Sequence, residues 1–261
     1  MKKQDRAGWT VTFHDEFENR ELDRNKWITR YVPGIAEAHR MSGEERQSPE
    51  AEYVIRDGIL HLRIQGEASK DQQIKPGNLA ASIQTGRFVR TEDGGWEFVG
   101  FKQKYGWFEI RCRMPKGPGL CSGFWLFFTD PYFMGLIQEG RKLPGDHDHA
   151  TEIDIFEQLG KEPYWNNFTV HHKQGHMHYN MDFDASEDFH VWALEWKEGE
   201  LIWHLDGEAI WRNQCKTPQQ EMFPLISFYH GSHSWRGDLD GSLAYPVDYE
   251  IDYIRVYKTA E

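Results

Sequence analysis

The chain has 261 residues, with 30 lysine and arginine side chains against 42 acidic ones, which gives a formal net charge of −12. Nucleic-acid-binding proteins present a basic face, so this charge argues against a nucleic-acid partner and, more weakly, against anionic membranes and heavily sulfated polymers. Aromatic residues make up 15% of the chain. That content excludes a disordered protein, because disordered chains lack the large rings that fill a core.

The cysteines and the N-terminal segment bear on compartment. Cys112, Cys121 and Cys215 are irregularly spaced, which predicts neither a disulfide framework nor a CxxC metal site. The charged start is followed by no apolar stretch, and no run of about 18 apolar residues occurs, so we predict neither a signal peptide nor a membrane helix. We expect a monomer with no membrane partner, secreted or at the cell surface after removal of a leader, with the cytoplasm as the alternative.

The predicted elements are short strands with an apolar–polar period of two, and no segment has a helical stripe. In chain order they cover residues 9–13, 59–64, 105–114, 123–128, 151–158, 168–172, 189–196, 201–205, 209–212, 223–229 and 249–257. Many short strands between turns favour one all-β sandwich or barrel domain over residues 1–261. We expect the last strand to lie beside the first and Asp206-Gly207 to form a hairpin turn. Longer loops are predicted at 31–50, 66–98, 131–150 and 231–247, where they would wall a cleft.

The strand at 151–158 carries three acids. Glu152 and Asp154 share one face of a regular strand, which would turn Glu157 toward the core. A buried unpaired carboxylate is costly, so we predict a β-bulge at Ile155–Phe156 that sends both apolar side chains inward and returns Glu157 to the acidic face.

Such a row of acids is suited to glycoside hydrolysis. The Cα atoms of Glu152 and Glu157 would lie about 13 Å apart, and side chains leaning together would approach the separation of about 5–5.5 Å that a retaining glycosidase needs. Crowding raises the pKa of one acid, so one can hold a proton while another is ionised. A solvated acidic face and a metal-binding cluster are the alternatives.

With these residues the chain resembles glycoside hydrolase family 16, the laminarinase-like retaining endo-β-glycanases. The sequence Glu-Ile-Asp-Ile-Phe-Glu at 152–157 is similar to the family's bulged Glu-x-Asp-x-x-Glu motif. Further stretches similar to family strands lie, in order, at 13–17, 105–111, 124–126, 189–196, 203–207 and 252–257. The resemblance implies an all-β jelly-roll sandwich of two antiparallel curved sheets with a concave substrate cleft.

The resemblance also implies roles for the acids. Glu152 would be the nucleophile, Asp154 would orient it, and Glu157 would be the general acid and base, with retention of anomeric configuration. No cofactor is required for this chemistry. The family's structural calcium, held by an acid of the opening strand and one of the closing strand, would fall on Glu16 and Asp252, for which a salt bridge or a solvated acid is the alternative.

Aromatic rings stack on the C–H faces of sugars. We predict substrate contacts from Trp125, which matches a family position before the acids, from Trp235, in a loop similar to the family's Gly-Gly-Asn-Trp loop, and from Trp107; core packing is the alternative for each. The strand at 168–172 should adjoin the acids, so His172 or His171 is expected to border them. The two point to opposite faces, and only one can do so.

The partner is therefore expected to be a polysaccharide or oligosaccharide. Cys121 stands where laminarinases have the first Trp of a Trp-Pro-Ala-Phe-Trp run, and the loop at 130–149 is long. Both departures leave a β-1,3- or mixed-linkage glucan and a β-galactan or galactose-containing glycan open as substrates. The alternative functions are a non-catalytic glycan-binding module and, from the histidine-rich loops, a metal-dependent hydrolase.

Overall fold

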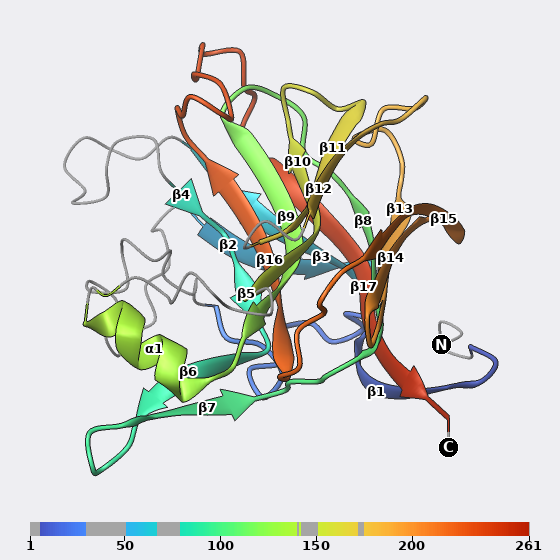
Figure 1. Cartoon of the computed structure of the whole chain (residues 1–261). Helices are drawn as coiled ribbons and strands as arrows, with labels where there is room; N and C mark the ends of the chain where they lie inside the picture. Colours follow the sequence, from blue (N-terminus) through green and yellow to red (C-terminus); the bar gives the residue numbers. More distant parts are fainter. Residues whose placement is uncertain are drawn as a thin grey trace.

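A computed structural model describes residues 6–29, 51–66, 79–139, 141, 151–171 and 175–260. Two antiparallel sheets pack face to face (Figure 1). In the described residues no helix is long and apolar enough to cross a membrane.

The first sheet has eight strands in the order β15-β14-β13-β8-β17-β3-β2, with β1 also paired to β17. Its strands are β1 (Trp9–Asp15), β2 (Ala51–Arg56), β3 (Ile59–Ile64), β8 (Gly106–Arg113), β13 (His190–Lys197), β14 (Glu200–Leu205), β15 (Glu208–Gln214) and β17 (Val247–Thr259). The expected pairing of the last strand with the first is confirmed. Asp206 and Gly207 both have positive φ in the β14–β15 turn, which is the hairpin turn that Asp-Gly favours.

The second sheet has seven strands in the order β12-β11-β10-β9-β16-β4, with β5 also paired to β16. Its strands are β4 (Leu79–Ala80), β5 (Ile83–Gln84), β9 (Leu120–Phe128), β10 (Glu152–Leu159), β11 (Trp165–Val170), β12 (Gly175–Asn180) and β16 (Met222–His230). A separate hairpin, β6 (Gly86–Arg90) and β7 (Trp96–Gly100), lies beside helix α1 (Pro131–Gln138) (Figure 1).

Several elements occupy segments predicted as loops. Strands β4 to β6 and most of β7 fall within 66–98, and α1 falls within 131–150. The prediction of a loop without a helix at 131–150 is therefore wrong for residues 131–138. Helix α1 is only eight residues long, too short for a clear apolar period, and it begins where Asp130 caps the main-chain N–H of Tyr132 and Pro131 takes the first position. The predicted loop at 31–50 lies outside the described residues.

The main core lies between the two sheets and is rich in aromatic rings. Trp192, Trp196 and Trp203 are each 1% exposed and belong to it. A second buried cluster gathers Phe88 and Phe98 of the β6–β7 hairpin, Phe133 of α1, and Trp125 and Phe127 of β9. This second cluster covers part of the outer face of the second sheet, the face turned away from the main core.

Strand β10 contains the predicted bulge. Asp154 lies opposite Trp125 of β9 and Phe156 lies opposite Phe124, so Ile155 is the extra residue. Ile153, Ile155 and Phe156 are all buried in the main core. The bulge therefore lets two consecutive apolar side chains face inward, and the acids before and after them share the outer face.

A hydrogen bond across the core holds the bulged segment. The indole N–H of Trp203, on β14 of the opposite sheet, donates to the main-chain carbonyl of Asp154 at 3.1 Å. A bulge disrupts the regular ladder, and a buried carbonyl needs a partner there. Trp203 thus ties the strand that carries the acids to the other sheet.

We expect Trp203→Phe to destabilise the protein by about 1–3 kcal/mol more than Trp196→Phe does, because it removes the buried hydrogen bond from the Trp203 indole to the Asp154 carbonyl. Trp196 is the matched control: it is equally buried, and within the described residues its indole N–H finds no acceptor. Urea unfolding of both variants measures the difference. Equal losses would show that the Trp203 hydrogen bond contributes nothing.

Candidate functional site

The outer face of β10 presents Glu152, Asp154 and Glu157. Asp154 is almost fully buried, at 3% side-chain exposure, and Glu152 retains 25%. Glu157 is half-buried. Two of the three carboxylates are therefore accessible from outside, on either side of a buried one.

Strand β11 and the residue that follows it bring polar groups beside the acids. Asp154 lies opposite Thr169 and Glu157 opposite Asn167, while the main-chain N–H of His171 donates to the carbonyl of Glu152. The Asn167 side-chain amide donates to Glu157 at 3.0 Å. Sequence reasoning did not identify Asn167 as a site residue. Strand alternation gives the signal that could have found it, because positions 167 and 169 share a strand face with His171.

His171 is the histidine that meets the acids. Its Nε2 lies 3.0 Å from Asp154 Oδ2 and 3.6 Å from Glu152 Oε1, and its ring is 44% exposed. Of the two histidines weighed from the sequence, His171 takes this position. The prediction for His172 lies outside the described residues.

Burial and crowding hold protons on the acids. Burial raises the pKa of Glu152, and repulsion from Asp154 raises it further, while the positive charge of His171 opposes both effects. Burial also raises the pKa of Asp154. The pKa of Glu157 rises to about 8, first through burial and then through repulsion from Asp154, against the hydrogen bond from Asn167. Such a group can carry a proton at neutral pH and release it to a substrate.

On the other flank of β10 the face is covered. Trp125 lies opposite Asp154 on the acid-bearing face, but it is 7% exposed, and its indole N–H donates to Ser227 of β16 at 3.2 Å. Its ring packs against Phe127 within the second cluster. Trp125 therefore lies beside the acids, as predicted, but little of its ring surface is accessible to a ligand.

Trp107 was predicted to contact substrate, and this is wrong. It lies on β8, in the other sheet, and its ring points out of the sandwich on the side opposite the acids. The ring is 2% exposed because Trp9 packs against it and the Arg6 guanidinium lies 3.3 Å from its centroid. The polar character of its strand face came from Glu109, whose carboxylate accepts the indole N–H.

Trp235 stays exposed, at 37%, in the loop after β16. This loop is joined to the start of β9, because the main-chain N–H of Gly119 donates to Arg236 and that of Gly231 donates to Gly119. Cys121, opposite Leu159 of β10, lies at the same end of the face. The loop thus borders the Glu157 end of the acidic row.

Cys121 is 3% exposed and lies opposite Tyr229 of β16. Burial raises the pKa of its thiol well above the ordinary value. It is therefore a neutral packing residue, unsuited to act as a nucleophile.

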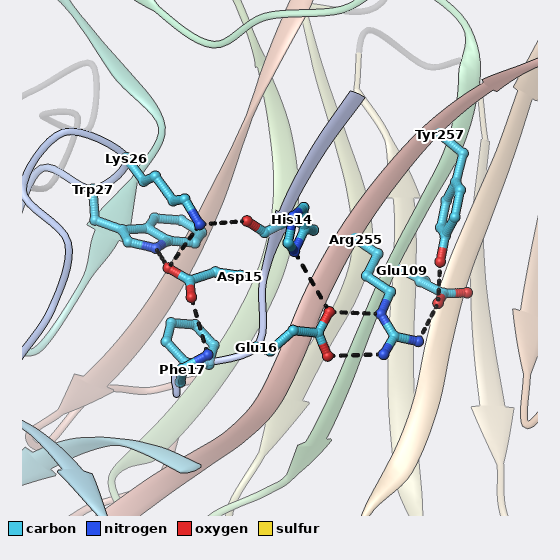
Figure 2. A network of polar contacts seen from close by, with 9 residues as sticks. All are labelled: His14, Asp15, Glu16, Phe17, Lys26, Trp27, Glu109, Arg255 and Tyr257. Carbon is cyan, nitrogen blue, oxygen red and sulfur yellow. Dashed lines mark hydrogen bonds and ion pairs between the residues drawn. The ribbon is translucent and has the colours of Figure 1, made fainter. Parts of the chain in front are cut away.

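The two carboxylates expected to hold calcium have arginine partners. Glu16 accepts both Nε and Nη2 of Arg255, at 2.9 and 2.8 Å, and is 6% exposed (Figure 2). Asp252 accepts from Arg111 at 2.8 Å. A divalent cation here would have to displace or sit beside two guanidinium groups, so these residues do not fit a calcium site.

Among the described residues, Glu152, Asp154 and His171 could together hold a metal ion. Each offers one ligand atom, and these three atoms lie within 4.8 Å of one another. The other histidine-rich stretch, at 146–149, lies outside the described residues.

The protein is a two-layered antiparallel sandwich in which three crowded carboxylates lie on the outer face of one central strand, and such a group of acids can carry out acid–base chemistry. The family model "Glycosyl hydrolases family 16" matches residues 68–255, and the chain belongs to this family. The fold is the expected β-jelly-roll sandwich.

Among curated relatives, an endo-1,3-1,4-beta-glycanase of Rhizobium meliloti (strain 1021) is 24% identical over 97% of this chain and 52% of its own length. A beta-glucanase of Brevibacillus brevis is 30% identical over 78% of this chain and 68% of its own. The chain spans about half the length of the first of these relatives.

Two solved structures share the fold. A GlcNAcα1-4Gal-releasing endo-β-galactosidase from Clostridium perfringens aligns with a TM-score of 0.73 at 21% identity, covering 100% of this chain and 64% of that one. The laminarinase catalytic domain from Thermotoga maritima MSB8 aligns at 0.66 and 24% identity, covering 97% and 99%.

We expect Glu157→Gln to melt at a higher temperature than wild type at pH 8, by on the order of a few degrees. The folded state holds the Glu157 proton up to about pH 8, whereas the unfolded chain releases it near 4.5, so the wild type loses stability as pH rises between these values. The amide is neutral throughout and pays no such penalty.

Scanning calorimetry at pH 4 and pH 8 tests this. The advantage of the variant should shrink toward pH 4, where the wild-type carboxyl is protonated. An equal difference at both pH values would contradict the raised pKa of Glu157.

Proposed function

We propose that this chain is the catalytic domain of a retaining endo-β-glycanase, acting as one domain over its whole length. The observation that carries the proposal is the row of Glu152, Asp154 and Glu157 on one face of β10, where burial and mutual repulsion raise the pKa of both Glu152 and Glu157 to about 8. Membership of glycosyl hydrolases family 16 supports it.

The reacting form of the site has Glu152 ionised and the proton on Glu157. In the first step, a carboxylate oxygen of Glu152 attacks the anomeric carbon. The bond from that carbon to the leaving oxygen breaks, and Glu157 gives its proton to this oxygen. In the second step, Glu157 takes a proton from water, the water oxygen attacks the anomeric carbon, and Glu152 leaves as the carboxylate. Two inversions retain the configuration. No step needs a metal or cofactor.

Asp154 and His171 are positioning residues in this proposal. Asp154 is buried between the two reacting carboxylates, and its negative charge raises the pKa of both. His171 bonds to Asp154 and lies near Glu152, so it fixes the Asp154 side chain and brings positive charge to the nucleophile.

The substrate we propose is a β-linked polysaccharide, either a 1,3- or 1,3/1,4-glucan or a galactose-containing glycan. The curated relatives named above favour a glucan as the substrate. The similarity to the endo-β-galactosidase structure is the reason to retain a galactose-containing glycan as the other candidate. Buried Cys121 leaves no tryptophan ring at the place where laminarinases carry one.

We expect wild-type protein to cleave one polymer among laminarin, lichenan, agarose, porphyran, keratan sulfate and mucin O-glycans, and Glu152→Gln to lose at least about 10³-fold in rate. Mass spectrometry of the products identifies the polymer, and NMR of the first product should show the retained anomer. Glu162→Gln, an exposed acid beyond the end of β10, is the matched control and should keep wild-type activity.

An inverted first product would overturn the assignment of Glu152 as nucleophile. Binding without cleavage of any polymer would instead favour the second candidate, a non-catalytic glycan-binding module, although the presence of all three acids speaks for catalysis.

We expect His171→Gln to move both limbs of the pH profile of kcat/KM to higher pH. The positive charge of His171 lowers the pKa of Glu152 and Glu157, so removing it raises both. His190→Gln, on the other sheet beside Asp206, is the control. A lower rate with an unchanged pH profile would reduce His171 to a packing role.

A further inference from the structure

The acid-bearing face is open on one flank of β10. On the β9–β16 flank, Trp125, Phe127 and Phe223 are 7%, 5% and 0% exposed, and they pack into the second cluster. On the β11–β12 flank, His176 and His178 of the edge strand are exposed and Trp165 is half-exposed. A glycan that leaves the acids across β11 and β12 meets accessible side chains in the described residues.

Strand register places these side chains in line with the acids. Glu157 pairs with Asn167, and Asn167 pairs in turn with His178. Asp154 pairs with Thr169, and Thr169 with His176. Two inter-strand steps of about 4.8 Å put the histidines about 10 Å from β10, which is about two sugar units.

The patch has the chemistry of a sugar platform. The rings of Trp165 and His178 stack, with centroids 5.0 Å apart and planes at 25°, and the His176 ring lies 5.4 Å from His178. Edge strands are commonly protected by charged residues, yet Gly175–Asn180 has no lysine, arginine or acid. Flat rings with hydrogen-bonding groups at their edges suit a pyranose.

We propose that Trp165, His178 and His176 form a sugar-binding subsite for the glycan chain whose scissile bond lies at Glu152 and Glu157. This proposal rests on the proposed function and adds the direction of the chain, across β11 and β12. Asn167 connects the subsite to the reaction, since it contacts Glu157 and lies opposite His178. Longer oligosaccharides should therefore bind better than short ones.

The test uses a length series of labelled laminari-, lichenan- and keratan-derived oligosaccharides. Trp165→Ala and His178→Ala should raise KM for the longest substrate about 3- to 10-fold more than for the shortest one cleaved. Tyr164→Ala is the matched control, because Tyr164 is 53% exposed and directly precedes Trp165 in the chain. It should match wild type at every length.

An equal rise in KM at all lengths, or none, overturns the subsite. The melting temperature checks that each variant folds. If Trp165→Ala does not fold, His178→Gln is the milder substitution to test. If wild type cleaves nothing, calorimetry measures the affinity of the intact protein for the same series of oligosaccharides. A loss of affinity in Trp165→Ala that grows with oligosaccharide length supports the subsite, although the proposed function fails. Absence of binding overturns both.

Discussion

The site depends on one extra residue in β10. Ile155 lets Ile153, Ile155 and Phe156 all enter the core, so that Glu152 and Asp154 before the bulge and Glu157 after it share the outer face. Without the bulge, strand alternation would turn Glu157 into the core and Phe156 onto the outer face with the other acids. Burying the carboxylate and exposing the ring are both costly. Trp203 secures the distortion from the opposite sheet by a bond to the Asp154 carbonyl. Packing of the core thereby fixes the spacing of the acids.

The two outer faces of the sandwich treat their carboxylates differently. On the side of the first sheet, Glu16 is hydrogen-bonded to Arg255 (Figure 2). Asp252 is hydrogen-bonded to Arg111. On β10, the described residues place no lysine or arginine in an ion pair with the acids, and His171 is their one cationic neighbour by contact. Buried acids without strong countercharge keep their protons to higher pH. A general acid at neutral pH needs that condition.

Flanking elements give the acid-bearing face a direction. The β6–β7 hairpin and α1 bury the aromatic rings of β9 and β16 in the second cluster. Edge strand β12 has no such cover in the described residues and presents His176 and His178. The same sheet therefore uses aromatic rings as packing on one flank of the acids and leaves rings accessible on the other.

The sequence by itself determined the all-β class, the bulge and the acidic row, because period-two alternation and the cost of burying Glu157 are local properties. Alternation left a sandwich and a barrel open, and the family resemblance selected the two-sheet sandwich. Tertiary structure decided which aromatic rings are accessible: Trp107 belongs to the far sheet and Trp125 is covered. It also decided that Asn167 and His171 are hydrogen-bonded to the acids of β10 and that Arg255 is hydrogen-bonded to Glu16. These pairings join strands distant in the chain, and strand alternation assigns a side chain to a face without saying which sheet that face belongs to or what covers it.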